Sequence, residues 1–263
     1  MTIRRVSIQP EARMTNLPSI SLQLYSVRDA IEQDAQVTID RIAAIGYTQV
    51  EASYRSLSAN PRLGPAIRAA GLTSPSMTGT LVGADRAPVF ETAKELGAHA
   101  VIDTLVREDH WTTEADIRQT ADELNAAASE AAAYGLTVGY HNHWWELTHS
   151  FNGRTGFEVL VDALDPAVAL EVDAYWVAVG GQDVVPYVAK LSDRVRFLHV
   201  KDGPINHENK QQRPAGQGSL PIWDIVAVLP QLEIGVVEFD DYAGDIFGAI
   251  AESLTYLSAG SGK

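Results

Sequence analysis

A segment with helical periodicity that ends in glycine and is followed by a short β-rich run occurs four times in this chain. The glycines are Gly46, Gly71, Gly97 and Gly135, and the runs after them are YTQVEAS, LTSPSMTG, AHAVIDTL and LTVGYHN. Glycine enters the left-handed backbone region without a steric penalty, so it readily ends a helix. Short, apolar, β-branched runs are typical of strands buried on both faces. The repeat therefore predicts helices that alternate with the strands of a parallel sheet.

Four further segments meet the same criteria for strands: residues 19–26, 168–176, 195–202 and 234–241. Eight strands with helical segments between most of them, in 263 residues, predict a single (β/α)8 TIM barrel of the α/β class. We expect residues 1–16 to form an N-terminal tail and residues 17–263 to form the barrel. A doubly wound open sheet is the alternative, although no G-x-G-x-x-G follows an early strand. The polar loop over residues 202–222 resembles the long loops that grip substrates at one end of a barrel.

The composition excludes several classes of protein. The chain has no cysteine, which excludes disulfide scaffolds, thiolate zinc sites and thiol nucleophiles and is compatible with the cytoplasm. A net charge of −14 disfavours binding to nucleic acid. No apolar run approaches the ~20 residues that span a bilayer, and residues 1–18 lack the apolar stretch of a secretion signal. We therefore expect a cytoplasmic protein that binds neither nucleic acid nor membrane.

Polar side chains gather at the carboxyl ends of the predicted strands, where the active sites of barrel enzymes lie. The fifth to eighth strands end around the following pairs: His141 and His143, Glu171 and Asp173, His199 and Lys201, Glu238 and Asp240. Side chains alternate between the two faces of a strand, so the members of each of the first three pairs share a face. Imidazoles and carboxylates without thiolates suit Mn²⁺, Co²⁺, Mg²⁺ or Zn²⁺ at an open catalytic site.

Most of these residues have a structural explanation when each is taken alone. An aspartate at a strand end commonly caps the next helix, which accounts for Asp202 and Asp240 as well as a functional role does. The combination of Asp173, His199 and Glu238 is harder to explain, because burying ionisable groups at one rim is costly. We assign structural roles to three histidines, His99, His110 and His149. The tryptophans at 144, 145, 176 and 223 fit wall packing, although aromatic walls also suit a sugar ring.

At these residues the sequence resembles the sugar phosphate isomerase/epimerase family of xylose isomerase-like barrels. The matching segments lie between about residue 20 and residue 257: QLYSVRD (23–29), GYTQVE (46–51), YHNHWWE (140–146), DAYW (173–176), HVKD (199–202), GQGSLPIW (216–223) and VVEFDD (236–241). The resemblance implies one divalent metal held by a carboxylate on strand five, Asp on six, His on seven and Glu on eight. By position it implies Asp173, His199 and Glu238 as ligands. It also implies a sugar or keto-sugar substrate and a homo-oligomer.

Strand five departs from the family pattern, because the position of the usual glutamate is occupied by His141. Two completions of the ligand set are open. Either His141 replaces the glutamate, or Glu146 folds back from the loop to supply the carboxylate. We favour His141 as the ligand, because the position of a residue on a strand is better determined than that of a residue on a loop. We favour Mn²⁺ as the metal. Glu146 would then contact the substrate or support a ligand.

The resemblance implies an isomerase or epimerase that abstracts a proton next to a carbonyl and forms an ene-diolate. In this hypothesis Glu238 is ligand and base, His141 or His143 is the partner acid, and Lys201 stabilises negative charge. A histidine on strand five is similar to inosose dehydratase-like and keto-sugar lyase members, so β-elimination from a keto-sugar, keto-glycoside or inosose is the alternative. A barrel that binds carbohydrate without turnover is a third reading. The predicted substrate contacts are Gln23, Arg28, Glu51, Trp176 and Arg213, and the absence of a glycine-rich phosphate cradle favours an unphosphorylated sugar.

Overall fold

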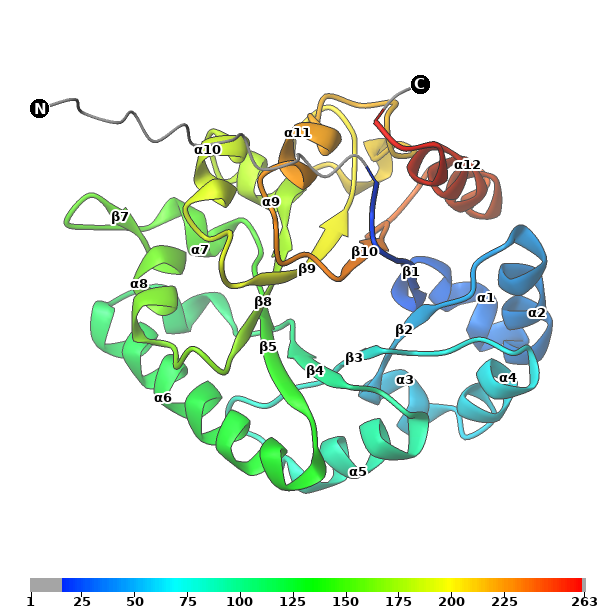
Figure 1. Cartoon of the computed structure of the whole chain (residues 1–263), viewed down its shortest axis with the longest axis horizontal. Coiled ribbons are helices and arrows are strands. Elements are labelled where there is room, and N and C mark those ends of the chain that lie inside the picture. The colour runs from blue at the N-terminus through cyan, green and yellow to red at the C-terminus, as the bar shows by residue number, and fades with distance from the viewer. Residues whose placement is uncertain (1–15, 262–263) are drawn as a thin grey trace, which may run out of the picture.

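The computed structural model describes residues 16–261, in which eight parallel strands form a closed barrel (Figure 1). The order around the barrel is β1-β2-β3-β4-β5-β8-β9-β10, and β10 pairs with β1 to close it. The strands are β1 Ile20–Gln23, β2 Val50–Ser53, β3 Ser76–Thr78, β4 Ala100–Asp103, β5 Thr137–His141, β8 Ala169–Asp173, β9 Val195–Val200 and β10 Ile234–Val237. Each lies within one of the eight segments predicted from the sequence. The predicted TIM barrel is therefore confirmed.

Helices surround the barrel, as Figure 1 shows. They are α1 Arg28–Gln33, α2 Ala35–Ile45, α3 Tyr54–Ala59, α4 Leu63–Ala69, α5 Ala87–Leu96, α6 Glu114–Ala131, α7 Trp145–Thr148, α8 Gly156–Ala163, α9 Ala174–Val179, α10 Val184–Ala189, α11 Ile222–Val226 and α12 Ile246–Ala259. A small hairpin of β6 (Ser150–Phe151) and β7 (Arg154–Thr155), which we did not predict, lies between α7 and α8. Within residues 16–261 no helix is long and apolar enough to cross a membrane.

The local sequence accounts for where the helices begin and end. Gly46 and Gly97 follow α2 and α5 with φ of 115° and 82°, as the repeat of glycines predicts. Asp34 caps α2 by accepting a hydrogen bond from Val37 N at 3.1 Å, and Thr155 and Glu158 form a capping box on α8. Most of the predicted tail, residues 1–15, falls outside the described residues.

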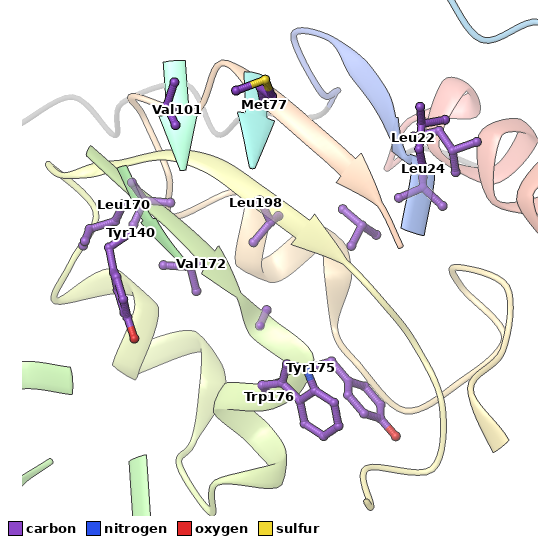
Figure 2. Close-up of a cluster of buried hydrophobic side chains, with 14 of the residues drawn as sticks. Leu22, Leu24, Met77, Val101, Tyr140, Leu170, Val172, Tyr175, Trp176 and Leu198 are labelled. Carbon is purple, nitrogen blue, oxygen red and sulfur yellow. The ribbon is translucent and has the colours of Figure 1, made fainter. Parts of the chain in front are cut away.

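Side chains alternate along each strand between the outer face of the barrel, which is apolar, and the inner face, which is apolar at first and ionisable toward the carboxyl end. Outward side chains such as Leu22, Met77, Val101, Leu170 and Leu198 pack in the large cluster beneath the helices (Figure 2). A separate cluster is formed by the alternate positions: Ala100, Ile102, Ala169, Phe197, Ile234 and Val236. Two residues further along β8 and β9 and just past β10, this second face carries Glu171, His199 and Glu238. On β8, β9 and β10 the inward side chains therefore change from apolar to ionisable between one inward position and the next, two residues further along the chain.

Candidate metal centre

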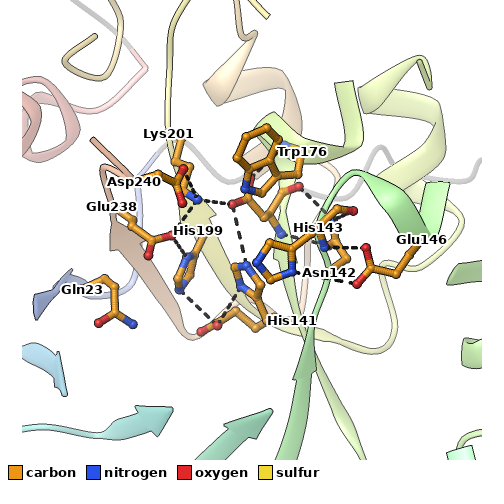
Figure 3. Close-up of polar contacts among 12 residues, drawn as sticks. Gln23, His141, Asn142, His143, Glu146, Trp176, His199, Lys201, Glu238 and Asp240 are labelled. Carbon is orange, nitrogen blue, oxygen red and sulfur yellow. Dashed lines mark hydrogen bonds and ion pairs between the residues drawn. The ribbon is translucent and has the colours of Figure 1, made fainter. Parts of the chain in front are cut away.

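Four side chains converge at the carboxyl end of the barrel: His141 of β5, Asp173 of β8, His199 of β9 and Glu238 directly after β10. Figure 3 shows three of them, His141, His199 and Glu238. One nitrogen or oxygen of each lies within 4.8 Å of the others, and all four residues are buried. His199 Nδ1 lies 2.8 Å from Glu238 Oε2, and His141 Nε2 lies 3.8 Å from Asp173 Oδ2. The structure thus brings together the four side chains predicted as metal ligands.

The two oxygens of Asp173 do different things. Asp173 Oδ1 caps α9 by accepting a hydrogen bond from Trp176 N at 2.9 Å, while Oδ2 faces His141 and the ammonium of Lys201. Asn142 fixes this strand end, because its side chain accepts from Asp173 N at 3.0 Å and donates to Asp173 O at 3.3 Å. The capping role and the cluster role therefore coexist in one carboxylate.

A second layer of carboxylates lies directly behind the two histidines. Glu171 Oε2 is 3.1 Å from His141 Nδ1 and 3.1 Å from His199 Nε2. Glu51 Oε1 is also 3.1 Å from His199 Nε2 and accepts from Gln23 Nε2 at 2.7 Å, while Ser76 donates to the other Glu51 oxygen. When a carboxylate accepts a hydrogen bond from one ring nitrogen of a histidine, the other ring nitrogen carries the lone pair and is free to bind a metal. This layer aims His141 Nε2 and His199 Nδ1 into the four-residue cluster.

The electrostatics suit a divalent cation. Burial, with a contribution from the neighbouring His199, lowers the pKa of His141 well below its ordinary value, which leaves a neutral imidazole with a free lone pair. Burial alone would raise the pKa of Glu238, but Lys201 and His199 hold it well below its ordinary value. Neutral imidazole and ionised carboxylate are the forms that bind metals. Burial would lower the pKa of His199, but Glu171 and Glu238 raise it well above its ordinary value, so a metal would displace a proton from this ring. With that proton displaced, the donor set fits Mn²⁺, Zn²⁺, Co²⁺ or Mg²⁺.

Lys201 lies in a ring of carboxylates beside this cluster. Its Nζ is 2.8 Å from Asp173 Oδ2, 2.7 Å from Glu238 Oε2 and 2.8 Å from Asp240 Oδ2. Burial disfavours the charged ammonium, but these three carboxylates raise the pKa of Lys201 well above its ordinary value. The cation is therefore retained in a buried position at the rim of the site.

His143 and Glu146 lie on the side of His141 away from Lys201 (Figure 3). The Glu146 carboxylate is turned away from the cluster, because it accepts hydrogen bonds from Tyr140 Oη at 2.7 Å and His143 N at 2.9 Å. Burial raises the pKa of Glu146 to about 8 and lowers that of His143 to about 3. Of the two completions left open by the sequence, His141 lies in the cluster and Glu146 does not.

The predicted substrate contacts have different surroundings. Trp176 is almost fully buried and lines a hollow of about 480 Å³, which we call the inner hollow; its other walls include His143, Trp144, Trp145, His207 and Asp240. Gln23 and Glu51 are buried in the layer behind His199 and bonded to protein groups. Arg28 stacks over the ring of Tyr25 at 4.0 Å, and Arg213 is exposed with its backbone N bonded to Asp202 O at 2.9 Å. The structure does not bring either arginine into the cluster.

Asp202 is buried and organises the long loop after β9. Its Oδ1 accepts from Gly203 N at 2.8 Å and Leu220 N at 3.0 Å, and its Oδ2 accepts from Gly216 N at 2.9 Å and Gly218 N at 3.0 Å. A Cβ at position 218 would collide with this carboxylate, so the turn requires glycine there. Asp202 is therefore a loop anchor and not a cap of the next helix.

Two residues acquire roles that sequence reasoning did not assign. Glu171 bridges the two histidines from behind, and its alternation with Asp173 was the only signal of its inward orientation. Asp240 links Lys201 to the loop, because it exchanges hydrogen bonds with the Gln212 side chain at 2.7 and 2.8 Å. The spacing gave no indication of this link, because it joins residues on two different loops.

Comparisons with known proteins agree with this architecture. Residues 39–244 match the family model of the xylose isomerase-like TIM barrel. Among solved structures, a sugar phosphate isomerase/epimerase from Parabacteroides distasonis is 22% identical with a TM-score of 0.74, and the match covers 96% of each chain. IolI protein with a binding zinc atom is 13% identical with a TM-score of 0.70, over 92% of this chain and 98% of that one.

A further similar structure is that of a D-allulose 3-epimerase from Methylomonas sp., which is 13% identical with a TM-score of 0.66 over 94% of this chain and 99% of that one. No curated protein sequence matches the chain. At these identities the solved structures support the fold, whereas the family model covers most of the sequence. The chain belongs to the xylose isomerase-like TIM barrel family.

Proposed function

We propose that this chain is a divalent-metal-dependent isomerase or epimerase of an unphosphorylated sugar or keto-sugar. The observation that carries the proposal is the convergence of His141, Asp173, His199 and Glu238 from four separate strands at the carboxyl end of the barrel. Burying four metal-ligating groups together is costly unless a cation compensates them. When bound there, a divalent ion such as Mn²⁺ would polarise the substrate carbonyl and stabilise negative charge on the ene-diolate oxygens.

The residues around the cluster would handle the protons. Glu238, which Lys201 and His199 keep ionised, would remove the proton next to the carbonyl. Neutral His143, which lines the inner hollow, would accept a proton from another direction and, once protonated, would return it. Lys201 would stabilise negative charge that develops on the substrate, since its ammonium is held beside Asp173 and Glu238.

A metal-dependent lyase or dehydratase is the second candidate, and one observation favours it. The two groups available for proton transfer are unlike, because one is the carboxylate of Glu238 and the other the imidazole of His143. Symmetric epimerisation is served by two similar groups, whereas β-elimination needs a base for the carbon acid and a group that passes a proton to the leaving group. His143 is neutral in the free site, so it would first take up the proton that Glu238 removes from carbon and would then pass it to the leaving group. Both reactions begin with the same proton abstraction.

The metal is tested by calorimetric titration of EDTA-treated protein with Mn²⁺. We expect wild type to bind one ion, His141→Ala to lose it, His141→Glu to retain it and Glu146→Gln to bind as wild type does. The Glu146 variant is the matched control, because it alters a neighbouring buried carboxylate outside the cluster. If wild type binds no ion, the metal enzyme is refuted and a barrel that only binds carbohydrate becomes the better explanation.

The reaction is tested with the Mn²⁺-loaded protein and a panel of keto-sugars and glycosides in D₂O, followed by NMR. Deuterium at the carbon next to the carbonyl without loss of a substituent indicates isomerisation or epimerisation. Release of water or an aglycone indicates elimination. Absence of both, for a ligand that demonstrably binds, refutes both enzymatic proposals.

A further inference from the structure

A second hollow adjoins the inner hollow at the mouth of the barrel. It is an open depression of about 700 Å³, and its walls include Leu105, Arg107, Thr112 and His149. We call it the outer hollow. Trp144 and Trp145 line both hollows, so this pair forms the boundary between them. Each hollow falls in the size range of small-molecule sites, about 300–1,000 Å³.

We propose that the outer hollow is a binding subsite for the second ring of a glycoside whose first sugar ring occupies the inner hollow, next to the metal centre. The inference rests on the proposed function and deepens it, because it specifies the substrate class as a glycoside with a cyclic aglycone or second sugar. A substituent on a sugar bound in the inner hollow would reach the outer hollow by passing the Trp144–Trp145 boundary.

The boundary is built for ring contacts. Trp145 stacks on His143 with centroids 4.2 Å apart and an interplanar angle of 7°, so that face of its indole ring is already covered. Trp144 meets Trp145 edge to face, with centroids 5.7 Å apart. Trp144 and Trp145 are each half-buried, so part of each indole ring is open to a ligand. Indole surfaces bind sugar C–H faces and aromatic rings alike.

Leu105 supplies a further apolar contact in the outer hollow. Its side chain is 58% exposed, and among residues 16–261 the large hydrophobic side chains with comparable exposure are Tyr25 and Val37. The backbone at this position is fixed, because Leu105 N donates to buried Asp103 Oδ1 at 3.1 Å. The apolar wall is thus held in place before any ligand arrives.

The charges of the outer hollow favour a neutral ligand. The cation Arg107 is paired with Asp109 at 2.9 Å, and Glu108 adds a further acid on the same wall. A phosphate or carboxylate group would meet these acids and find the guanidinium already engaged. A neutral ring, whose hydroxyl groups could bond to Thr112 or His149, suits this lining better.

The test compares two ligands that differ only in the second ring, by calorimetry on the Mn²⁺-loaded protein. The probes are methyl and phenyl β-D-glucopyranoside and the corresponding α anomers. We expect the phenyl glycoside of one anomer to bind about tenfold more tightly than its methyl counterpart. Leu105→Asn should remove most of that difference, whereas Val37→Asn, which alters an equally exposed apolar residue on α2, should preserve it.

The outcomes separate the subsite from the proposed function. If methyl and phenyl glycosides bind equally, or if Leu105→Asn weakens both to the same degree, the subsite is refuted while the metal enzyme stands. If neither binds although Mn²⁺ does, the glycoside class is refuted and the subsite with it. If Leu105→Asn changes the mass of the protein in sedimentation velocity, the outer hollow is an interface between copies of the chain, and the proposal is overturned.

Discussion

Asp202→Asn should loosen the loop that connects β9 to α11, because the carboxylate of Asp202 accepts four backbone N–H groups. Asparagine has nearly the same shape but only one oxygen. That oxygen can keep two of the four hydrogen bonds, so the amide NH₂ group faces the other two donors. With the oxygen at the Oδ1 position, the donors left without an acceptor are Gly216 N and Gly218 N.

The size of the effect follows from these two donors. A buried donor without a partner costs about 1–3 kcal/mol. Gly216 and Gly218 are themselves exposed, so a small shift of the loop lets water solvate their N–H groups. The loss therefore belongs near the lower end, about 2–3 kcal/mol for the pair. That is a large part of the total stability of a typical domain, about 5–15 kcal/mol.

Two measurements separate global from local effects. Urea unfolding followed by circular dichroism reports the free energy of unfolding of the whole barrel. Limited proteolysis, with cleavage sites mapped over residues 203–220, reports opening of the loop alone. Asp193→Asn, an exposed aspartate in the turn before β9, is the matched control. If Asp202→Asn matches wild type in both assays, the reasoning that this carboxylate anchors the loop is wrong.

Three further predictions concern the buried ionisable groups. Glu171→Gln should weaken Mn²⁺ binding about 10–100-fold in calorimetry, because it weakens the acceptor that orients His141 and His199; unchanged affinity would contradict this role. Lys201→Met should lower the free energy of unfolding of the metal-free protein by about 3–5 kcal/mol, because buried Asp173 and Glu238 and half-buried Asp240 lose their cation; unchanged urea unfolding would refute this. Glu146 keeps its proton in the native state up to about pH 8 but in the unfolded state only to about 4.5, so its contribution to stability falls as pH rises through this range. Glu146→Gln should reduce that fall, by at most about 1.4 kcal/mol per pH unit, and an identical pH dependence in urea unfolding would count against the assignment.

The barrel was predictable because its signals are local and repeated. Gly46 and Gly97 each end a helix in the left-handed conformation, and a short apolar strand follows each of them. The inward orientation of His141, Asp173 and His199 was predictable for a similar reason, because alternation along a strand is fixed by backbone geometry. Sequence reasoning succeeded where one element sets the position of a side chain.

The remaining features depend on contacts between elements that the sequence does not link. Glu146 is turned away from the cluster by the hydroxyl of Tyr140, which lies on the outward face of β5. Asp202 is an anchor because glycines 14 and 16 residues later fold back onto it. Neither contact has a periodicity or motif that could be detected in advance. Both require the positions of side chains from separate segments.

The charge balance of the site connects its stability with its proposed chemistry. Five carboxylates are gathered around one lysine and two histidines in the upper part of the barrel: Glu51, Glu171, Asp173, Glu238 and Asp240. Lys201 compensates one edge of this group, and His141 is held neutral by burial. Asp173 and Glu238, the two carboxylates of the four-residue cluster, share Lys201 with Asp240, so three carboxylates are offset by one ammonium. A divalent cation would offset the repulsion there, and the same cation would supply the charge stabilisation that proton abstraction next to a carbonyl requires. The arrangement that makes the metal-free barrel electrostatically unfavourable is therefore the one that would make the metal-loaded barrel reactive.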